Sequence, residues 1–543
     1  MAKLPDRALS AEISRRSLVK GVAAAAAAFS AASVAAGCSA GGPSADQSGK
    51  KIFRWVQASP GVALDVQRSA SADVACVADA VCEGLLRWSA EGELVPVLAA
   101  ESPAWSEDGL VLTMKLKEGV KFHNSADFTA EDVKYTFTRM FRPETEGVNT
   151  ALFDMIQGAG DVMSGDSDEL SGVEVVDDLT VAFHLSAPFA QFESNLGTGF
   201  ALIYPHEACG EAGSDWGAGG NLVGTGPYKM VSDDGSKVVL EANASWHGGE
   251  AALDGIEVTY VDDPAQRVRD VRDGDADACG VPVALLEELE GDEDAAELVR
   301  RVDTWGTCFI VLNMQDEAFQ DTRVRQALSL AVDRQELVDT VFAGAGSPCA
   351  CLLAPGIPGS LGSEAESLPY DPERALALVE EAGAGELTFS AATTGEFDTA
   401  VMEAVSQMWE PLGMHMRVSR IDADAYASGM AAGSIQCLFQ DWFPLYPDGG
   451  DVLYAYFQSA NAAERSSHYA SGDFDDLVGE ASRTLDGDAR AELYRQADAL
   501  VSSQDFACIP LVWPQRAYAA AKGAEMGCSG SATAYRVRDA ALS

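Results

Sequence analysis

Positive charge is scarce in this 543-residue chain, which has 37 Lys and Arg against 84 Asp and Glu and a formal net charge of −47 at pH 7. Nucleic acids and anionic lipid headgroups are themselves negative, so we expect neither to be a surface-wide partner. The composition is otherwise ordinary for a globular protein. The length alone predicts about three or four domains of roughly 150 residues each.

Signatures of catalysis and of metal binding are also missing. The 6 His residues are scattered, and the sequence contains no HExxH, no GxSxG and no paired Cys/His pattern. Cys349 and Cys351 stand too close together for the usual zinc half-site, and no second pair matches them. We therefore expect no enzymatic activity and no catalytic residues, and we predict neither a metal site nor a cofactor.

The first fifty residues carry export signals. Ser14–Lys20 contains two adjacent arginines and precedes an alanine-rich run over 21–36 that is too short and too weakly apolar for a membrane span, which is the layout of a twin-arginine signal. Residues 35–38, Ala-Ala-Gly-Cys, are similar to a lipobox, although Ala stands where Leu is preferred. We predict a signal peptide over 1–37 and a tether over 38–50 that is lipidated on Cys38; the alternative is ordinary cleavage or an uncleaved N-terminus.

The 11 Cys residues allow disulfide bonds in an exported chain, but the sequence does not reveal how they would pair. The alternative interpretation is that many of them are small buried core residues.

Residues 105–140 contain three local structures in succession. After a turn at Asp108-Gly109, apolar and more polar residues alternate over 110–117, the two-residue period of a half-buried strand. Thr129 and Asp132 have capping-box spacing, which predicts a helix that begins at Ala130. The buried stripe of this helix is expected to be Val133, Phe137 and Met140.

This stretch resembles the extracellular solute-binding proteins of family 5, the receptors of ATP-driven importers for peptides, nickel and related solutes. The shared residues are Trp105, Asp108, Gly109, Gly119 to His123 and Thr129 to Val133. Further matches are Glu83-Gly84-Leu85, Val223-Gly224-Thr225-Gly226-Pro227-Tyr228, and a run between Asn313 and Arg334. The resemblance covers nearly all of residues 50–520.

The resemblance implies an α/β, periplasmic-binding-protein-like fold of class II, with three domains in two lobes and mixed sheets. We expect a smaller domain at 83–204, called the inserted domain below, within lobe I. The core of lobe I is predicted from residues 51–82, 205–302 and 508–543, and lobe II from residues 303–507.

Several further elements follow from local patterns. Asp321 and Asp333 predict the starts of two consecutive helices, and Asp371 before Pro372 predicts a third that stops at Gly383. The acidic residues 287–301 are expected to form an exposed helix-like stretch.

The same resemblance implies a function. Two lobes would close over a peptide or peptide-like solute, which requires about 10⁴-fold preference for the closed form to move an equilibrium from about 1:99 to about 99:1. Expected partners are the permease and ATPase subunits of an importer and, through the lipid anchor, the outer face of the cytoplasmic membrane; we expect a monomer. The alternatives are a receptor for nickel, a metal chelate or another non-peptide solute, and a ligand sensor at the cell surface.

The segment 440–448 is the candidate lining of the binding cleft. In peptide-binding relatives an Asp three residues after a Trp pairs with the α-ammonium group of the ligand, but here Leu445 holds that position. The candidate ligand-binding residues in this segment are Asp441, Trp442, Phe443, Leu445, Tyr446 and Asp448. Trp305, Ser69 and Ser71 are further candidates, and core packing is the alternative for Trp442 and Phe443.

Leu445 leaves two interpretations of the ligand. Either Asp441 or Asp448 replaces the missing acid, or the ligand has no free amine at that point. An unpaired buried ammonium group costs about 3 to 5 kcal/mol, enough to abolish micromolar binding. Our hypothesis from the sequence is that an acetylated or otherwise amine-free ligand binds at least as well as a free dipeptide.

Overall fold

The computed structural model describes residues 49–362 and 369–543. The predicted signal peptide, Cys38 and nearly all of the predicted tether lie outside these residues. Within them, no helix combines the length and the apolar character that a membrane crossing needs.

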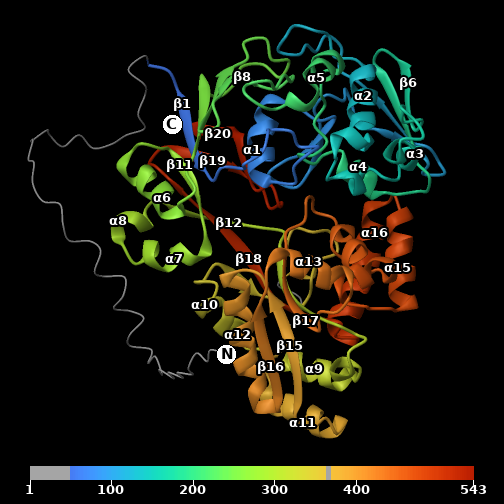
Figure 1. Ribbon diagram of the computed structural model, residues 1–543, viewed down its shortest axis with the longest axis vertical. Coiled ribbons are helices and arrows are strands. Elements are labelled where there is room, and N and C mark those ends of the chain that lie inside the picture. The colour runs from blue at the N-terminus through green and yellow to red at the C-terminus, as the bar shows by residue number, and fades with distance from the viewer. Residues whose placement is uncertain (1–48, 363–368) are drawn as a thin grey trace, which may run out of the picture. The chain divides into compact units, whose positions relative to one another are not determined.

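One mixed sheet of 12 strands runs through both predicted lobes (Figure 1). Its main path is, in spatial order, β16 (Met414–Arg420), β15 (Leu387–Thr393), β17 (Cys437–Trp442), β13 (Thr307–Leu312), β18 (Cys508–Ala520), β11 (Ala278–Val281), β1 (Ile52–Gln57), β10 (Gly255–Tyr260), β9 (Lys237–Ala242) and β8 (Tyr228–Asp233). The strands β12 (Val299–Asp303) and β14 (Gly346–Pro348) lie off this path and pair with β18.

Strand β18, which the predicted boundaries assign to lobe I, pairs with strands of both lobes. Its first part pairs with β13 through Cys508–Val512, and its last part pairs with β12 and β11 through Gln515–Ala520. In Figure 1 it runs from beside β15 and β17 toward β11 and β1. Its 13 residues therefore join the two sheet regions as one continuous strand.

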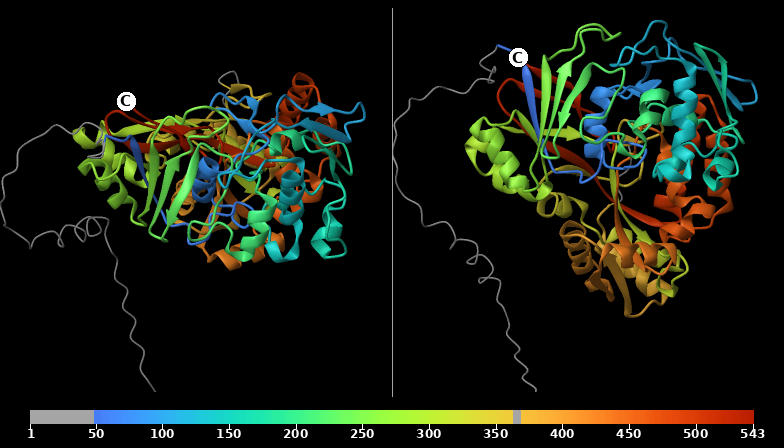
Figure 2. Two further views of the ribbon diagram at one scale, coloured as in Figure 1. Left: turned by 90° about the horizontal axis from the view of Figure 1, so that it is seen from above. Right: turned by 45° about the horizontal axis from the view of Figure 1, so that its top comes forward.

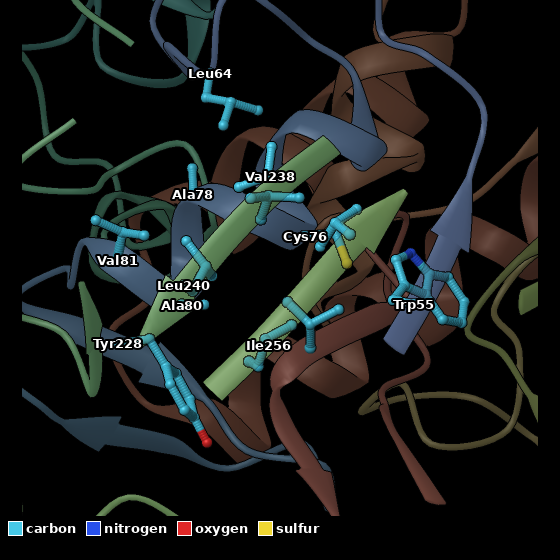
Figure 3. Packing of buried hydrophobic residues seen from close by; sticks show 14 of the residues in the cluster. Trp55, Leu64, Cys76, Ala78, Ala80, Val81, Tyr228, Val238, Leu240 and Ile256 are labelled. Carbon is cyan, nitrogen blue, oxygen red and sulfur yellow. The ribbon is translucent and has the colours of Figure 1, made fainter. Parts of the chain in front are cut away.

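The core of lobe I forms where α1 (Ala72–Val81) packs against this sheet. Figure 3 shows Cys76, Ala78 and Val81 of this helix beside Leu240 of β9 and Ile256 of β10, and all five are buried. Two further strands, β19 (Ala524–Cys528) and β20 (Tyr535–Leu542), form a separate hairpin whose residues join the same cluster. The predicted core of lobe I also contains four further helices, α5 (His206–Ala212), α6 (Pro264–Asp273), α7 (Val283–Glu290) and α8 (Glu293–Ala296).

The inserted domain confirms the local predictions for residues 105–140. Its sheet has the order β4 (Ala104–Trp105), β5 (Val111–Lys115), β7 (Thr180–His184) and β6 (Val173–Asp177), and it also contains β2 (Leu86–Trp88), β3 (Leu94–Pro96), α3 (Ala159–Ser164) and α4 (Gln191–Asn195). Helix α2 (Ala130–Phe141) begins at the predicted residue, and the Thr129 backbone N–H donates to Asp132 Oδ2 over 2.9 Å. Its predicted stripe of Val133, Phe137 and Met140 is buried.

Lobe II confirms the predicted helix caps. Asp321, Asp333 and Asp371 cap α9 (Thr322–Leu330), α10 (Arg334–Thr340) and α11 (Pro372–Ala382) through their side chains. Gly383 ends α11 with a φ of 65°, where a left-handed backbone favours glycine. The remaining helices of this lobe are α12 (Glu396–Trp409), α13 (Ala423–Ala431), α14 (Ser459–Ala462), α15 (Gly472–Arg483) and α16 (Gly487–Ala499).

The prediction of one helix-like stretch over 287–301 is wrong in its second half. Helix α7 ends at Gly291, and Asp292 caps the short α8 by accepting from the N–H groups of Asp294 and Ala295. Residues 299–303 then form β12, because backbone pairing with β18 is available there.

The cysteines agree with the alternative interpretation, in which many of them are small buried core residues. The ten in the described part of the chain form no disulfide there, and nine of them are buried.

Candidate functional site

A cavity of about 530 Å³ is lined by residues of both lobes. This volume lies within the range of small-molecule sites. Lobe I contributes residues from β1, α1, α6 and α7; lobe II contributes residues from β13, α12 and β17; and β18 supplies Pro514 to Ala517. Two other hollows, of about 590 and 690 Å³, are each lined by one lobe alone. Only a ligand in the first of these three could contact both lobes.

The predicted segment 440–448 reaches this cavity through Asp441 and Phe443. Trp442 lies between them and belongs to the other face, because successive side chains of a strand point to opposite sides. Its indole Nε1–H donates to Asp451 Oδ1 over 2.6 Å, and its ring meets Tyr456 edge-on at 5.6 Å. Trp442 therefore packs into the core of lobe II, the alternative that the sequence left open for it.

Phe443 is held firmly at the cavity wall. The guanidinium of Arg516 lies 4.1 Å from the centre of its ring and donates to the carbonyl oxygens of Ser531 and Ala532 over 3.2 and 2.8 Å. On the other side, a Cβ at Gly306 would stand 2.5 Å from the Phe443 ring, so only glycine fits there. The ring thus offers a fixed aromatic surface, which suits an apolar part of a ligand.

The end of the segment packs against lobe I and the inserted domain instead of the cavity. Tyr446 is buried and stacks on Trp88, with 6.3 Å between the ring centres and 12° between the planes. Leu445 packs at the edge of the lobe I core. Asp448 is buried too, and its Oδ2 accepts from Arg490 Nε over 3.0 Å. Its carboxylate is therefore already paired.

The three candidates outside this segment also do not line the cavity. Ser71 is the N-cap of α1 and accepts from the Asp73 backbone N–H over 3.2 Å, while Ser69 Oγ accepts from the Ser71 N–H over 3.2 Å. Trp305 is only 8% exposed, and its backbone N–H donates to Gly530 O over 2.8 Å. Their contacts are those of a helix start and of a junction between the lobes.

Three charged residues of the cavity were missed by sequence reasoning: Asp73, Arg267 and Arg516. Burial raises the pKa of the Asp73 carboxyl, an effect that the nearby Arg267 opposes. Burial likewise raises the pKa of Asp441, although solvent still reaches its side chain; Arg516 opposes the shift, and Asp398 adds to it. No local sequence motif marks these residues. Each is a charged residue of a kind common on protein surfaces, and only the fold brings the three to one cavity.

Asp451 contacts the candidate segment 440–448 through its carboxylate. Its carboxylate accepts from Trp442 Nε1 and, over 3.1 Å, from the Leu445 backbone N–H. Burial raises its pKa to about 7, against the effect of these two hydrogen bonds, and Asp448 contributes in the same direction as burial. This partly buried acid therefore holds the stretch between the cavity and the inserted domain in place.

Among the described residues, no group of three or more His, Cys, Asp or Glu side chains is placed to hold a metal ion.

Comparison with known proteins gives the chain a family context. The family model described as bacterial extracellular solute-binding proteins, family 5 Middle, matches residues 93–464. Heme-binding protein A of Haemophilus influenzae is 28% identical over 433 residues, which cover 76% of this chain and 78% of that protein. The dipeptide-binding protein of Escherichia coli is 27% identical over 438 residues, covering 76% and 79%.

Solved structures confirm the predicted fold class. The murein tripeptide-binding protein MppA in its unliganded open form superposes with a TM-score of 0.79 at 21% identity, over 91% of this chain and 97% of that one. The chain therefore has the α/β fold of the periplasmic binding proteins.

Proposed function

This chain belongs to the bacterial extracellular solute-binding proteins of family 5, which are transport receptors and not enzymes, and we propose that it captures a peptide or peptide-like small solute for an ATP-driven importer. The observation that carries this proposal is the cavity shared by both lobes. The relatives are named for the binding of heme and dipeptides, so a small organic solute fits the family's range.

Capture proceeds by closure of the two lobes around a hinge. With the predicted boundaries, the chain crosses between the lobes twice, near residue 303 and near residue 508. A hydrogen bond links the two crossing segments: Thr304 Oγ1 donates to Pro514 O over 2.5 Å. A solute that contacts both walls stabilises the closed form, and a preference of about 5.5 kcal/mol is enough for a nearly complete shift.

The receptor works outside the cytoplasmic membrane. A twin-arginine signal exports it, Cys38 carries the lipid, and permease and ATPase subunits receive and drive the solute. Two or three acyl chains give a stable anchor, since each buried CH₂ contributes about 0.8 kcal/mol. A Cys38→Ser variant should lose palmitate labelling and move from the membrane fraction to the soluble fraction; unchanged labelling would rule out this anchor.

The test of solute capture starts with native mass spectrometry of the protein as purified from its own cells. A copurifying small molecule is identified and then titrated back by calorimetry into the stripped wild type. Ala58→Trp fills the cavity from the lobe I side and should abolish binding, while the exposed Ala218→Trp should leave it unchanged. Equal affinity of the Ala58 variant, or chemical turnover of the solute, would contradict the proposal.

A further inference from the structure

A second hollow, called the lobe II groove below, lies apart from the cavity. Its volume is about 590 Å³, and it is lined by α10, α11, α12 and residues next to them. Figure 1 shows α11 at the lower end of predicted lobe II. None of the described residues that line the groove also lines the cavity. A partner bound in the groove would therefore occupy a site separate from that of the captured solute.

Helix α12 forms one side of the groove with a face that the core does not use. Its buried side chains are Val401, Met402, Val405 and Trp409. The side chains that line the groove are Ala400, Glu403, Ala404, Gln407 and Met408. Their spacing of i, i+3, i+4, i+7 and i+8 places them on one side of the helix, in a stripe about 12 Å long. The two alanines in this stripe leave room for a side chain of a partner.

The α11 side of the groove exposes large apolar side chains to solvent. Tyr370, which lies just before α11, is 53% exposed, and Leu376 within the helix is 43% exposed. Nine large apolar side chains are exposed in the described part of the chain, so two of them in one groove are a local concentration. Apolar side chains gathered in this way mark an interaction surface.

The groove also carries negative charge that no base balances. Glu336 of α10 and Glu403 of α12 line it, and both are exposed. Within the described residues neither carboxylate forms an ion pair, and no Lys or Arg lines the groove. Arg374 of α11 binds Glu381 instead, over 2.7 Å. A basic group of a partner would therefore meet two unpaired acids.

Two kinds of occupant fit this surface poorly. A second copy of the chain would bring a formal net charge of −47 to an acidic groove, and like charges repel. A small solute buries most of its surface in a concave site, whereas one lobe alone forms this groove and no second lobe covers it. A segment of another protein, which covers the groove with its own surface, fits better.

We propose that the lobe II groove docks a segment of a partner protein that carries a large apolar side chain beside a Lys or Arg. The apolar side chain lies over Ala400 and Ala404, and the basic group pairs with Glu336 or Glu403. The desolvated apolar side chain contributes most of the affinity. The exposed charge pairs contribute mainly to the rate of association and make it depend on salt.

Selection of peptides on the full-length protein tests this inference. A phage-displayed library of random peptides is panned on the wild type after depletion on Ala404→Trp, in which the new indole fills the groove. The enriched sequences should carry a Lys or Arg close to a Leu, Phe or Trp, and they should be poor in Asp and Glu. Ala400→Trp, at an exposed position of the same stripe, is a second filled variant in case Ala404→Trp does not fold.

Fluorescence anisotropy with the most enriched peptide assigns the contacts. Either Trp variant should weaken binding by about 30-fold or more, because it removes the place of the apolar anchor. Glu336→Gln and Glu403→Gln together should weaken it by about 5-fold at low salt, and high salt should abolish this difference. Glu480→Gln in α15 removes an exposed, unpaired acid of the same lobe and should change nothing. A thermal melt verifies that each variant is folded.

Three results would overturn the inference. They are no enrichment on the wild type over the filled variants, enriched sequences without a basic residue, and equal affinity of the wild type and the double Gln variant at low salt. Solute capture is judged separately, because calorimetry should give Ala404→Trp the same affinity for the copurified solute as the wild type.

Discussion

Asp441 and Asp448 stand seven residues apart in one segment, yet their surroundings are opposite. Asp448 is buried, accepts from Arg490 and caps the short turn at Gly450 through its Oδ1. Asp441 lines a cavity, its side chain is exposed, and it forms no ion pair with a described residue. The difference teaches that a carboxylate in a recognisable segment is available to a ligand only if the fold leaves it unpaired.

The largest effect is expected from Asp451, which accepts hydrogen bonds from Trp442 and Leu445 of the same segment. An acid with a raised folded-state pKa costs stability as pH rises, because its native form must give up a proton that it holds more tightly than the unfolded chain does. With a pKa of about 7 against an ordinary value of 3.8, the cost develops between about pH 4 and pH 7 and is on the order of 4 kcal/mol. Below that window the cost is absent, and above it the cost is complete.

Urea unfolding of the wild type and of Asp451→Asn across pH 4 to 8 measures this cost. As pH rises, the free energy of unfolding of the wild type should fall relative to that of the variant. Parallel pH profiles for the two proteins would refute the assignment.

Removal of the buried pair at Asp448 should cost about 3 kcal/mol of stability, because Asp448→Asn leaves the Arg490 guanidinium without its acid. The side chains are 7% and 19% exposed, so solvent compensates only partly. Denaturant unfolding at pH 7.5 checks this value. A loss below about 1 kcal/mol would show that the two acids differ less than their environments suggest.

Contact between the inserted domain and lobe II should contribute a smaller amount. Gln191 Nε2 donates to the Tyr494 hydroxyl over 2.5 Å, and α16 lies beside α4 in Figures 1 and 2. Tyr494→Phe leaves that buried N–H group unpaired and should cost about 1 to 2 kcal/mol. Tyr454→Phe is the control, since its hydroxyl bonds to no described residue, and equal losses in the two variants would contradict the role of this bond.

The smallest effect is expected at Asp441 itself. Asp441→Asn breaks no ion pair with a described residue, and an amide oxygen can still accept from the residue's own backbone N–H, so the free energy of unfolding should stay within about 0.5 kcal/mol of the wild type. A larger loss in the same denaturant experiment would mean that the acid has a structural partner.

The sequence predicted elements whose signals are local. The strand over 110–117, the helix from Ala130 and the caps at Asp321 and Asp333 depend on neighbouring residues, and all of them are confirmed. Residues 299–303 became a strand only because β18, more than 200 residues later, lies beside them. The predicted domain boundaries remain predictions.

The site was predictable only in part for the same reason. The segment 440–448 does reach a cavity, but strand alternation separates Asp441 and Phe443 from Trp442, and sequence alone did not reveal which face was which. Asp73 and Arg267 come from chain segments almost 200 residues apart and join the cavity only after folding. Neither composition nor a local motif reveals that two such distant residues line the same cavity.

The central claim is that a solute closes the two lobes around β18, and small-angle X-ray scattering tests it most directly. Saturation with the copurified solute should reduce the radius of gyration of the wild type and leave that of Ala58→Trp unchanged. A wild-type curve that stays the same at saturation, with binding verified by calorimetry on the same sample, would contradict capture by lobe closure.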